Sequence, residues 1–281
     1  MNKKYPSLTS ILNKNIIVDV VDVGAANIEE PPVFDTLLKQ RKVNVIGFEP
    51  NLKALEMLNN SKSENEIYLP YVIGDGKPHT LNLCQMYGMT SILEPNYEIL
   101  QTFNYFSDWA QIYNRLPVET KRIDDVEEIK NIDFFKLDIQ GAELIVLENS
   151  VEKLKNCLVI QTEVEFLPMY VNQPLFSEIE MFLRKQGFIL HNLLPFGRRM
   201  VKPLLDPNNM HAGINQLLWA EAIFIKDFNN LGNFSEDKLL RYCLILHDIY
   251  GSYDVVLKIL YDFDQRSKTN YSMDYKNALV R

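Results

Sequence analysis

Short runs of apolar, β-branched residues alternate along the chain with longer segments of helical periodicity. The short runs predict strands at 16–23, 43–48, 67–73, 133–137, 157–164, 188–193 and 217–225, and the longer segments predict helices at 30–40, 51–59, 142–154 and 175–186. Such alternation is typical of βαβ units, in which helices cover both faces of a parallel sheet. The loop 195–216 has no helical pattern, so we expect the last two strands to be antiparallel neighbours. The sequence therefore predicts an α/β fold with a doubly wound, seven-stranded, mostly parallel sheet.

Two segments depart from this alternation. The first is an aromatic-rich insert at 80–117, with an edge strand expected at 80–84 and another directly after the insert at 118–122. The second begins at Ser235, a helix-capping residue followed by two acids, and its helical spacing stops at Gly251 and resumes over 255–262. We interpret it as a helical hairpin followed by a polar tail, 265–281.

The chain is therefore expected to divide into a main domain, 1–230, which includes the insert, and a C-terminal helical appendage, 231–281. The appendage either packs against the main domain, mediates a homo-oligomer or closes over a substrate. Packing or oligomerisation is the interpretation that we favour over closure of a substrate site.

Composition and charge narrow the function classes. Of the 281 residues, 47% are hydrophobic, which is enough for a large buried core. The formal net charge of −8 argues against non-specific nucleic-acid binding. No uncharged apolar run approaches about 18 residues, so no transmembrane segment is expected, and Asp19 and Asp22 interrupt the first apolar run before it resembles a signal peptide. Three widely spaced cysteines predict neither disulfides nor a cysteine-bound zinc, so the expected location is the cytoplasm.

The ends of the first two strands carry a candidate nucleotide site. Gly24, within Asp-Val-Gly-Ala-Ala, allows a tight turn beside a ligand at the carboxyl edge of the sheet. Glu49 follows the second strand and is placed to accept hydrogen bonds from both hydroxyls of a ribose. Together they favour an adenosine-containing ligand. The glycine motif of dinucleotide sites and the Walker A motif are both absent, which favours a ligand without phosphate, such as S-adenosylmethionine.

A third motif follows the fourth parallel strand. In Lys-Leu-Asp-Ile-Gln-Gly-Ala-Glu-Leu, residues 136–144, Asp138 leaves the sheet near the topological switch point and is a candidate either for chemistry or for a helix N-cap. The next strand ends in Glu163 and Glu165, and their spacing places both on one face of the sheet. Each is a candidate general base or a cap for a backbone turn. Paired acids can also hold Mg²⁺, but without a D-x-D or histidine cluster we predict no metal site.

These motifs, in this order, resemble those of the FkbM-family methyltransferases, a branch of the class I S-adenosylmethionine-dependent enzymes. The resemblance extends over about 20–225, and its most specific part is the segment 136–144. The matching segments are VDVGAA (21–26), GFEPN (47–51), VIGDG (72–76), TSILEPN (90–96), VETKRIDDV (118–126), FFKLDIQGAELIVLENS (134–150), TEVEFLPMYVNQPLFSEI (162–179) and LLWAEAIFI (217–225).

The resemblance implies which residues form the site. Those expected to bind the cofactor S-adenosylmethionine are Asp22, Gly24, Ala25, Glu49, Pro50, Asn51, Gly74, Asp75, Asp138 and Gln140. The first three would line its methionyl part, Glu49 would hold the ribose, the next four would lie near the adenine, and the last two would face the transferable methyl group. Catalysis is expected from Asp138 and Glu163, and substrate binding from Ser91, Glu165 and His191.

The implied activity is O-methylation. An acceptor hydroxyl would displace the activated methyl group, helped by alignment and by a nearby base. The acceptor would be a small molecule or a glycan, with a sugar of a surface polysaccharide or its precursor preferred. Two alternatives stay open at this point: an NAD-dependent oxidoreductase on a similar sheet, which the missing glycines disfavour, and a non-catalytic module that binds an adenosine ligand.

Overall fold

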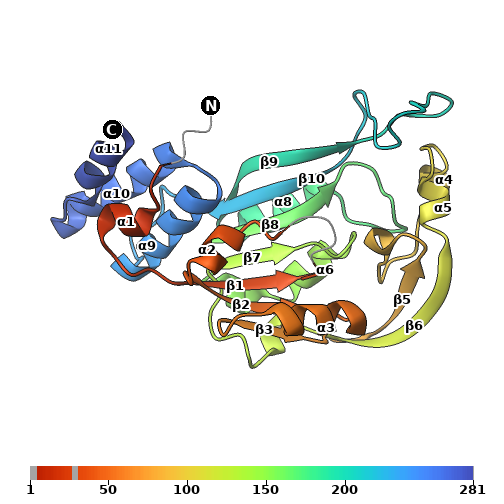
Figure 1. Cartoon of the computed structure of the whole chain (residues 1–281), viewed down its shortest axis with the longest axis horizontal. Coiled ribbons are helices and arrows are strands. Elements are labelled where there is room, and N and C mark those ends of the chain that lie inside the picture. Colours follow the sequence, from red (N-terminus) through yellow and green to blue (C-terminus); the bar gives the residue numbers. More distant parts are fainter. Residues whose placement is uncertain (1–4, 27–30, 281) are drawn as a thin grey trace.

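A seven-stranded sheet forms the centre of the computed structural model, which describes residues 5–26 and 31–280 (Figure 1). The strand order is β3-β2-β1-β7-β8-β10-β9. Strand β10 is antiparallel to both of its neighbours, and the other pairings are parallel, which confirms the predicted fold with one reversed strand. The strands are β1 (Val18–Val23), β2 (Val43–Phe48), β3 (Glu66–Leu69), β7 (Phe134–Leu137), β8 (Val159–Glu165), β9 (Phe188–Arg198) and β10 (Leu217–Lys226).

Most of the helices that connect the strands are shorter than the sequence predicts, while the helix expected at 51–59 ends two residues later than predicted. The connecting helices are α2 (Asp35–Lys39), α3 (Leu52–Ser61), α6 (Glu143–Glu148), α7 (Val151–Leu154) and α8 (Phe176–Lys185). The helix expected at 142–154 is split because Asn149 and Ser150 donate side-chain hydrogen bonds to the carbonyls of Ile145 and Val146 at the end of α6. The helix expected at 30–40 begins only at Asp35, and residue 30 lies outside the described residues.

A second sheet lies beyond the carboxyl ends of the parallel strands and contains β4 (Val72–Ile73), β6 (Ile112–Lys121) and β5 (Pro78–Cys84) in that order (Figure 1). The single strand expected at 67–73 is therefore wrong. Pro70, which cannot donate a backbone hydrogen bond, separates β3 in the main sheet from β4 in the second sheet. The edge strand predicted at 80–84 is confirmed, because β5 lies at the edge of the second sheet. The edge strand predicted at 118–122 is wrong, because these residues fall largely in β6, which is the central strand of that sheet.

The remainder of the insert folds around its own apolar cluster. It contains the short helices η1 (Tyr87–Met89), α4 (Tyr97–Leu100) and α5 (Phe106–Trp109), and η2 (Ile123–Asp125) follows β6. Leu100, Phe103 and Phe106 are buried there together with Tyr170 and Leu218. Several of the insert's aromatic side chains thus serve as its core.

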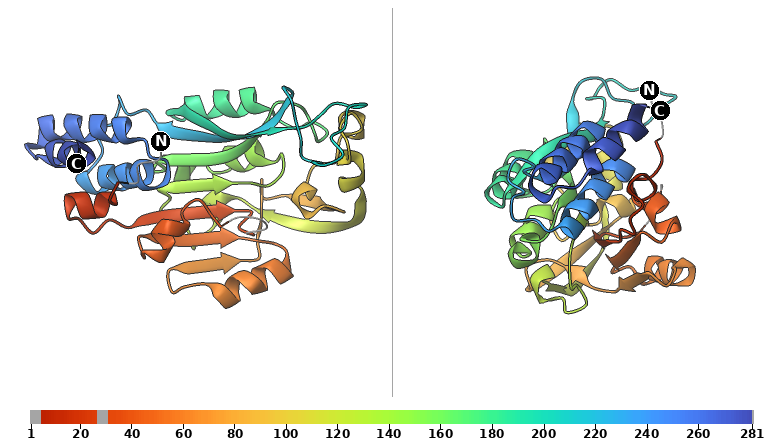
Figure 2. Two further views of the ribbon diagram at one scale, coloured as in Figure 1. Left: turned by 45° about the horizontal axis from the view of Figure 1, so that its top comes forward. Right: turned by 90° about the vertical axis from the view of Figure 1, so that its left-hand side faces the viewer.

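The C-terminal helices are α9 (Glu236–Leu244), the π-helix η3 (Ile245–Ile249), α10 (Tyr253–Ser267) and α11 (Tyr271–Val280). Together with α1 (Leu8–Leu12) they pack at the end of the main sheet opposite to the second sheet (Figure 2). The polar tail predicted at 265–281 is wrong, since 271–280 form α11. The sequence shows no apolar periodicity for this helix because Tyr275 is its one fully buried residue. The Tyr275 hydroxyl forms a hydrogen bond of 2.7 Å with Nδ1 of His247.

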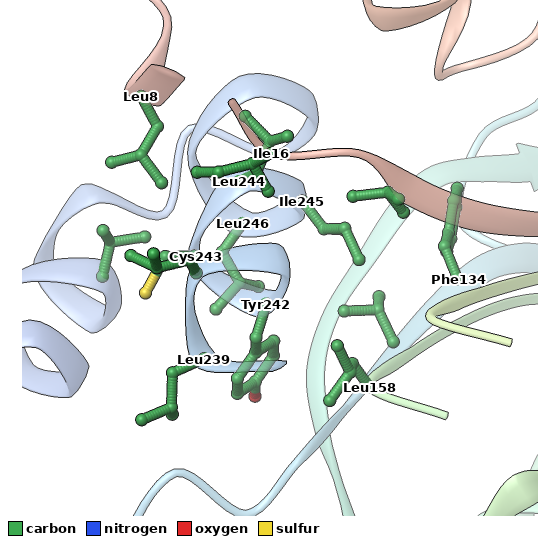
Figure 3. Packing of buried hydrophobic residues seen from close by; sticks show 14 of the residues in the cluster. Leu8, Ile16, Phe134, Leu158, Leu239, Tyr242, Cys243, Leu244, Ile245 and Leu246 are labelled. Carbon is green, nitrogen blue, oxygen red and sulfur yellow. The ribbon is translucent and has the colours of Figure 1, made fainter. Parts of the chain in front are cut away.

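One apolar cluster joins the C-terminal helices to the main sheet. Figure 3 shows side chains of α9 and η3, among them Tyr242 and Ile245, meeting Ile16, Phe134 and Leu158. This contact agrees with the interpretation from the sequence that 231–281 packs on the rest of the chain. Within the described residues, no helix is long and apolar enough to cross a membrane.

The face of the sheet beneath the C-terminal helices changes from apolar to polar along the strands. Val20, Phe134 and Val159 belong to the shared apolar cluster. Two residues further along the same strands are Asp22, Lys136 and Gln161, which lie next to one another in register and therefore on the same face. The opposite face carries the buried residues Val21, Phe135 and Ile160 under α6, α7 and α8. The polar part of this first face lies nearer to the carboxyl ends of the strands than its apolar part.

Arg241 of α9 anchors the C-terminal helices to the sheet through charge. Its Nη1 lies 3.0 Å from Oδ2 of the buried Asp133 and 3.2 Å from Oδ2 of Asp19. We expect Arg241→Met to lower the free energy of unfolding by about 2 kcal/mol in urea denaturation, because it leaves a buried carboxylate short of a charged partner. The control Lys258→Met removes an exposed ion pair with Asp262 and should cost less than about 0.5 kcal/mol. Equal effects of the two variants would contradict an anchoring role.

Candidate active site

Three strand ends meet at Gly24, directly after β1. The N–H groups of Gly24 and Ala25 both donate to the carbonyl of Phe48 at the end of β2, each over 3.1 Å. Gly24 has a φ of +82°, and a Cβ at this position would lie 2.1 Å from the backbone oxygen of Asp138. Only glycine satisfies both conditions. The turn therefore brings the ends of β1, β2 and β7 together, as the sequence predicts for this motif.

Glu49 is buried at the end of β2. Its Oε1 accepts hydrogen bonds from the N–H of Asn51 over 2.7 Å and from the hydroxyl of Tyr87 over 2.8 Å. Burial raises the pKa of Glu49, while these hydrogen bonds oppose the rise. Asn51 caps α3 by accepting from the N–H groups of Lys53 and Ala54, which confirms the predicted cap. Pro50 lies between Glu49 and Asn51, so hydrogen bonds fix the turn on both sides of Pro50.

Tyr87 is a member of the site that sequence reasoning did not identify. It lies in η1 of the insert, 38 residues from Glu49 along the chain, and its contact depends on how the insert folds back. No local pattern distinguishes it from the other tyrosines of the insert.

Six carboxyl groups gather at the carboxyl ends of β1, β7 and β8 and beside the amino-terminal half of the antiparallel strand β10, and we call them the acidic cluster: Asp22, Asp138, Glu143, Glu163, Glu165 and Glu221. Glu163 and Glu221 are paired in register on β8 and β10, and the preceding β8 residue on that face, Gln161, donates to Oε2 of Glu221 over 2.9 Å. Lys136 brings a positive charge to the cluster, with Nζ 3.3 Å from Asp22 and 4.0 Å from Asp138. In the described part of the chain, no other basic side chain forms an ion pair with these six acids.

Gln140 connects the acids expected to carry catalysis. Its Nε2 donates to Oδ1 of Asp138 over 2.9 Å and to Oε2 of Glu163 over 3.1 Å. Gln140 has a φ of 61° and Gly141 a φ of +95°, so two successive left-handed residues turn the chain sharply after Asp138. A Cβ at Gly141 would lie 2.7 Å from Nε2 of Gln173. The tight turn thus directs the Gln140 amide back toward the acids.

Glu165 is the most deeply buried acid of the cluster. Its side chain is fully buried. The side-chain amide of the buried Gln173 lies beside it, and a hydrogen bond from Gln173 opposes the rise in the pKa of Glu165 that burial causes.

Burial and mutual repulsion raise the pKa values of the acids. For Glu163 and Glu165 burial has the largest effect, followed by the negative charges of neighbouring acids, and both pKa values lie well above the usual range. Burial likewise raises the pKa of Glu143 to about 7 and raises that of Glu221. Burial and the neighbouring charges therefore favour the protonated form of Glu163 and Glu165 in the folded chain.

Four of the residues expected in the site have their contacts elsewhere in the structure: Gly74, Asp75, Ser91 and His191. Gly74 and Asp75 belong to the turn after β4, where Asp75 accepts from His79 and from the N–H of Lys77. Burial of Asp75 is outweighed by these bonds, which lower its pKa to about 2. Ser91 is buried in the insert, where its Oγ accepts from the N–H of Leu93. None of their hydrogen-bond partners among the described residues belongs to the acidic cluster.

His191 is the fourth. It lies on the edge strand β9, and its Nε2 is 2.7 Å from Oγ of Ser252, at the start of α10. Its partner is therefore in the C-terminal helices. The structure does not bring His191 together with Glu163 or Asp138, because β8 and β10 separate it from β7.

The comparison with protein families identifies the chain. The family model for the methyltransferase FkbM domain matches residues 22–190, more than half of the chain. The chain belongs to the FkbM methyltransferase family. It is accordingly an S-adenosylmethionine-dependent methyltransferase, and this assignment replaces the oxidoreductase alternative. The match includes every expected site residue except His191 of β9.

Similarity to other known proteins is distant. No curated protein sequence matches the chain. Among solved structures, the chain is similar to a magnesium protoporphyrin IX methyltransferase of Synechocystis PCC 6803 with bound S-adenosylmethionine, at 10% identity and a TM-score of 0.36, covering 78% of this chain and 76% of that one. A precorrin-6y C5,15-methyltransferase of Geobacter metallireducens GS-15 gives 10% identity, a TM-score of 0.37 and coverage of 78% and 85%. These TM-scores are too low to carry an argument about mechanism.

The residues at the carboxyl edge fit S-adenosylmethionine chemically. Gly24 leaves no side chain at the point where β1 meets Asp138, and a Cβ there would collide with the backbone. Glu49 offers a carboxylate for a pair of ribose hydroxyls, and the acids Asp22 and Asp138 suit a cationic sulfonium with its adjacent ammonium. When bound, the cofactor supplies an electrophilic methyl group.

The raised pKa of Glu165 predicts a pH-dependent effect on stability. Because the folded state binds the Glu165 proton up to a higher pH than the unfolded state, which releases it above about pH 4.3, the stability contributed by this proton is largest at low pH and declines as the pH rises. Glu165→Gln should therefore match wild type near pH 5 and exceed its free energy of unfolding by roughly 1–3 kcal/mol at pH 8, measured by urea denaturation at both values. The exposed Glu98→Gln serves as control. A pH-independent difference for Glu165→Gln would refute the buried-proton interpretation.

Proposed function

We propose that this FkbM methyltransferase transfers the methyl group of S-adenosylmethionine to a hydroxyl oxygen of a glycan or small molecule, with a sugar of a surface polysaccharide or its precursor as the preferred acceptor. The observation that carries the proposal is the position of Asp138. Its side chain is 37% exposed, it follows the central strand β7, and its backbone touches Gly24 at the expected cofactor turn. An acceptor that reaches the transferable methyl group would pass this carboxylate.

Asp138 is the proposed general base. As the acceptor oxygen forms its bond to the methyl carbon, the carbon–sulfur bond breaks, its electron pair stays on sulfur, and the hydroxyl proton passes to Asp138. Gln140 orients Asp138 through its 2.9 Å hydrogen bond and leaves Oδ2 free of that contact. Burial and the neighbouring acids raise the pKa of Glu163, which favours its protonated form, so Glu163 is better suited to donate a hydrogen bond to the acceptor than to remove a proton.

Glu49 is the proposed ribose ligand. A carboxylate offers about four lone-pair positions, and Asn51 and Tyr87 occupy two on Oε1. The ribose hydroxyls then bind Oε2, or they replace Tyr87 on Oε1. Asp22, Gly24 and Ala25 are proposed along the methionyl part, and Pro50 and Asn51 beside the adenine. Asp75 at the adenine edge stays a prediction, since its carboxylate already accepts from His79 and Lys77.

Two wider predictions accompany this function. A cytoplasmic location is proposed because all three cysteines are buried and free. A homo-oligomer formed through the C-terminal helices also stays a prediction, with Tyr261 and Met273 among the large apolar residues that these helices expose.

Glu49→Gln tests the ribose assignment. The substitution keeps the shape of the side chain but removes the charge that strengthens hydrogen bonds from ribose hydroxyls, so the affinity for S-adenosylhomocysteine should fall about 10- to 100-fold in calorimetric titration. Glu98→Gln should leave the affinity unchanged, and NAD should not bind to either protein. Undiminished affinity in a folded Glu49→Gln variant would remove Glu49 from the cofactor site.

Asp138→Asn tests the proposed base. With a panel of hydroxyl acceptors and labelled S-adenosylmethionine, kcat should fall about 100-fold or more, because an amide cannot take the hydroxyl proton. The affinity for S-adenosylhomocysteine should change less than about threefold. Asp262→Asn, an exposed acid of α10, is the matched control. A wild-type chain that binds the cofactor product yet methylates no hydroxyl acceptor would favour the non-catalytic binding module.

A further inference from the structure

The segment 194–214, which contains the end of β9 and most of the connection to β10, exposes many large apolar side chains, and we call it the hairpin loop. Of the 23 large apolar side chains that the described part of the chain exposes, seven lie in this one segment. They are Leu194, Phe196, Val201, Leu204, Leu205, Met210 and Ile214. Apolar side chains that gather on one surface segment, rather than lying scattered singly, indicate a surface that contacts something other than water.

The hairpin loop projects at the end of the molecule opposite to the C-terminal helices (Figures 1 and 2). Val201 forms a backbone bridge with Phe103 of the insert. The side-chain amide of Asn104, also in the insert, donates to the carbonyl of Leu204 over 2.8 Å. These contacts hold the backbone of the loop against the insert, so its exposed side chains are presented in fixed positions.

Arg199 closes the base of the loop. Its guanidinium lies 4.9 Å from the ring centre of Trp219 in β10, and its Nη2 lies 3.1 Å from Nδ1 of His211. Gly213 packs against the backbone of Arg198, where a Cβ would lie 2.5 Å from the carbonyl carbon. The loop is therefore folded on itself at its base, and its apolar side chains are not covered by this packing.

The hairpin loop is basic although the chain is acidic. It carries Arg198, Arg199 and Lys202 against one acid, Asp206, in a chain of formal net charge −8. The salt bridges of the described residues include none of these three basic side chains. The neighbouring α5 adds one acid, Asp108. Basic side chains among exposed apolar ones complement a surface that is negatively charged outside and apolar within.

Aromatic residues of α5 lie beside the hairpin loop. The exposed Tyr105 stacks on Trp109, with ring centres 5.9 Å apart, and the Trp109 ring lies 6.0 Å from that of His211 in the loop. Tyrosine and tryptophan are enriched where proteins meet the boundary between membrane and water, because one end of each side chain is apolar and the other forms hydrogen bonds. The aromatic pair therefore matches the same kind of surface as the loop.

The shape of the hairpin loop disfavours a protein as its partner. The cavity bounded by Arg199, Leu205 and Met210 has a volume of about 10 Å³, the size of one water molecule, so it cannot receive a side chain of a partner. A symmetric dimer through the loop would bring Arg198 and Lys202 of both copies together, and these like charges would repel one another. A lipid surface instead receives protruding side chains and supplies the negative charge.

We propose that the hairpin loop docks this enzyme on the surface of a membrane that contains anionic phospholipids. Val201, Leu204 and Leu205 enter the boundary between head groups and acyl chains, while Arg198 and Lys202 pair with lipid phosphates. The attachment is peripheral, since no helix of the described residues could span a membrane. Because the loop contacts the insert, which lies beyond the carboxyl ends of the parallel strands, docking places the proposed active site near the lipid surface (Figure 1).

Sedimentation of the full chain with lipid vesicles tests the proposal. Vesicles of phosphatidylcholine alone are compared with vesicles that also contain about 30% phosphatidylglycerol, at low ionic strength. We expect at least about tenfold tighter binding to the anionic vesicles, because each basic residue near an anionic surface contributes about fivefold. Salt at about 0.5 M should remove most of this difference, since it screens exposed charges.

Two double variants assign the binding to the hairpin loop. Arg198→Ser/Lys202→Ser should weaken binding to the anionic vesicles at least about tenfold, because the attraction to the lipid phosphates is lost. Leu204→Ser/Leu205→Ser should also weaken it at least about tenfold, because two apolar side chains no longer leave water. All four side chains are exposed, so both variants should fold, and thermal denaturation checks that they do.

Matched controls change the same kinds of side chain elsewhere on the surface. Lys62→Ser/Lys185→Ser removes two exposed positive charges, and Met57→Ser/Met181→Ser removes two exposed apolar side chains. Both controls should bind anionic vesicles as wild type does.

Three results would overturn the proposal: no binding to anionic vesicles, equal binding to both kinds of vesicle, and loop variants that bind as tightly as wild type. Sedimentation velocity without lipid examines the alternative partner. A chain that binds no vesicles but forms a dimer that Leu204→Ser/Leu205→Ser disrupts would assign the loop to a second copy. Vesicle binding is measured without cofactor or acceptor, so its failure leaves the proposed function standing.

Discussion

The site depends on the ion pairs that the ammonium group of Lys136 forms with Asp22 and Asp138. This lysine lies on the central strand β7, between Asp22 on β1 and Asp138 after β7, and it is largely buried. Burial alone would lower the pKa of Lys136, but the surrounding acids raise it by more than burial lowers it. The net result is a raised pKa, so the lysine stays charged. That charge stabilises the negative charge of Asp22 on the cofactor side and of Asp138 on the acceptor side. Burial nevertheless raises the pKa of Asp22, and burial together with the neighbouring acids raises the pKa values of Glu163 and Glu165, which have no ion pair among the described residues.

The C-terminal helices support the same face of the sheet from its other end. Beyond their apolar packing, Tyr250 donates a hydrogen bond to Oε1 of Gln161 over 2.9 Å, and Gln161 in turn donates to Glu221. Because Gln161 uses both ends of its amide, its orientation is fixed and Glu221 is held in place. A segment that the sequence suggests to be an appendage therefore helps to position an acid of the cluster. Its contacts lie behind the acids, on the amino side of the strands, and not over them.

Local sequence patterns correctly predicted the elements that are determined by residues close together in the sequence. The alternation of strand and helix, the glycine turn after β1 and the Asn51 cap all depend on residues within a few positions of one another, and the structure contains them. The wrong predictions depend on distant contacts: Pro70 sends the chain into a second sheet, and α11 is held by Tyr275 against His247. Among site residues, Asp138, Gln140 and Glu163 come together because parallel strands align their ends. His191 does not, since a strand position alone does not reveal which neighbour covers it.

The short helix η1 links the two ends of the site through the insert. Its first residue, Tyr87, donates to Glu49 at the proposed ribose position, and the carbonyl of its last residue, Met89, accepts from the buried Tyr170. The Tyr170 ring in turn lies against Gly141, in the turn that positions Gln140 between the acids. A single turn of three residues thus contacts both the cofactor-side carboxylate and the support of the acceptor-side turn. If ribose hydroxyls displace Tyr87 from Glu49, η1 must shift with it, and Tyr170 is the buried group that first experiences the change. A continuous chain of contacts in the insert thus connects the proposed cofactor and acceptor positions, in addition to the contacts of Lys136 with Asp22 and Asp138.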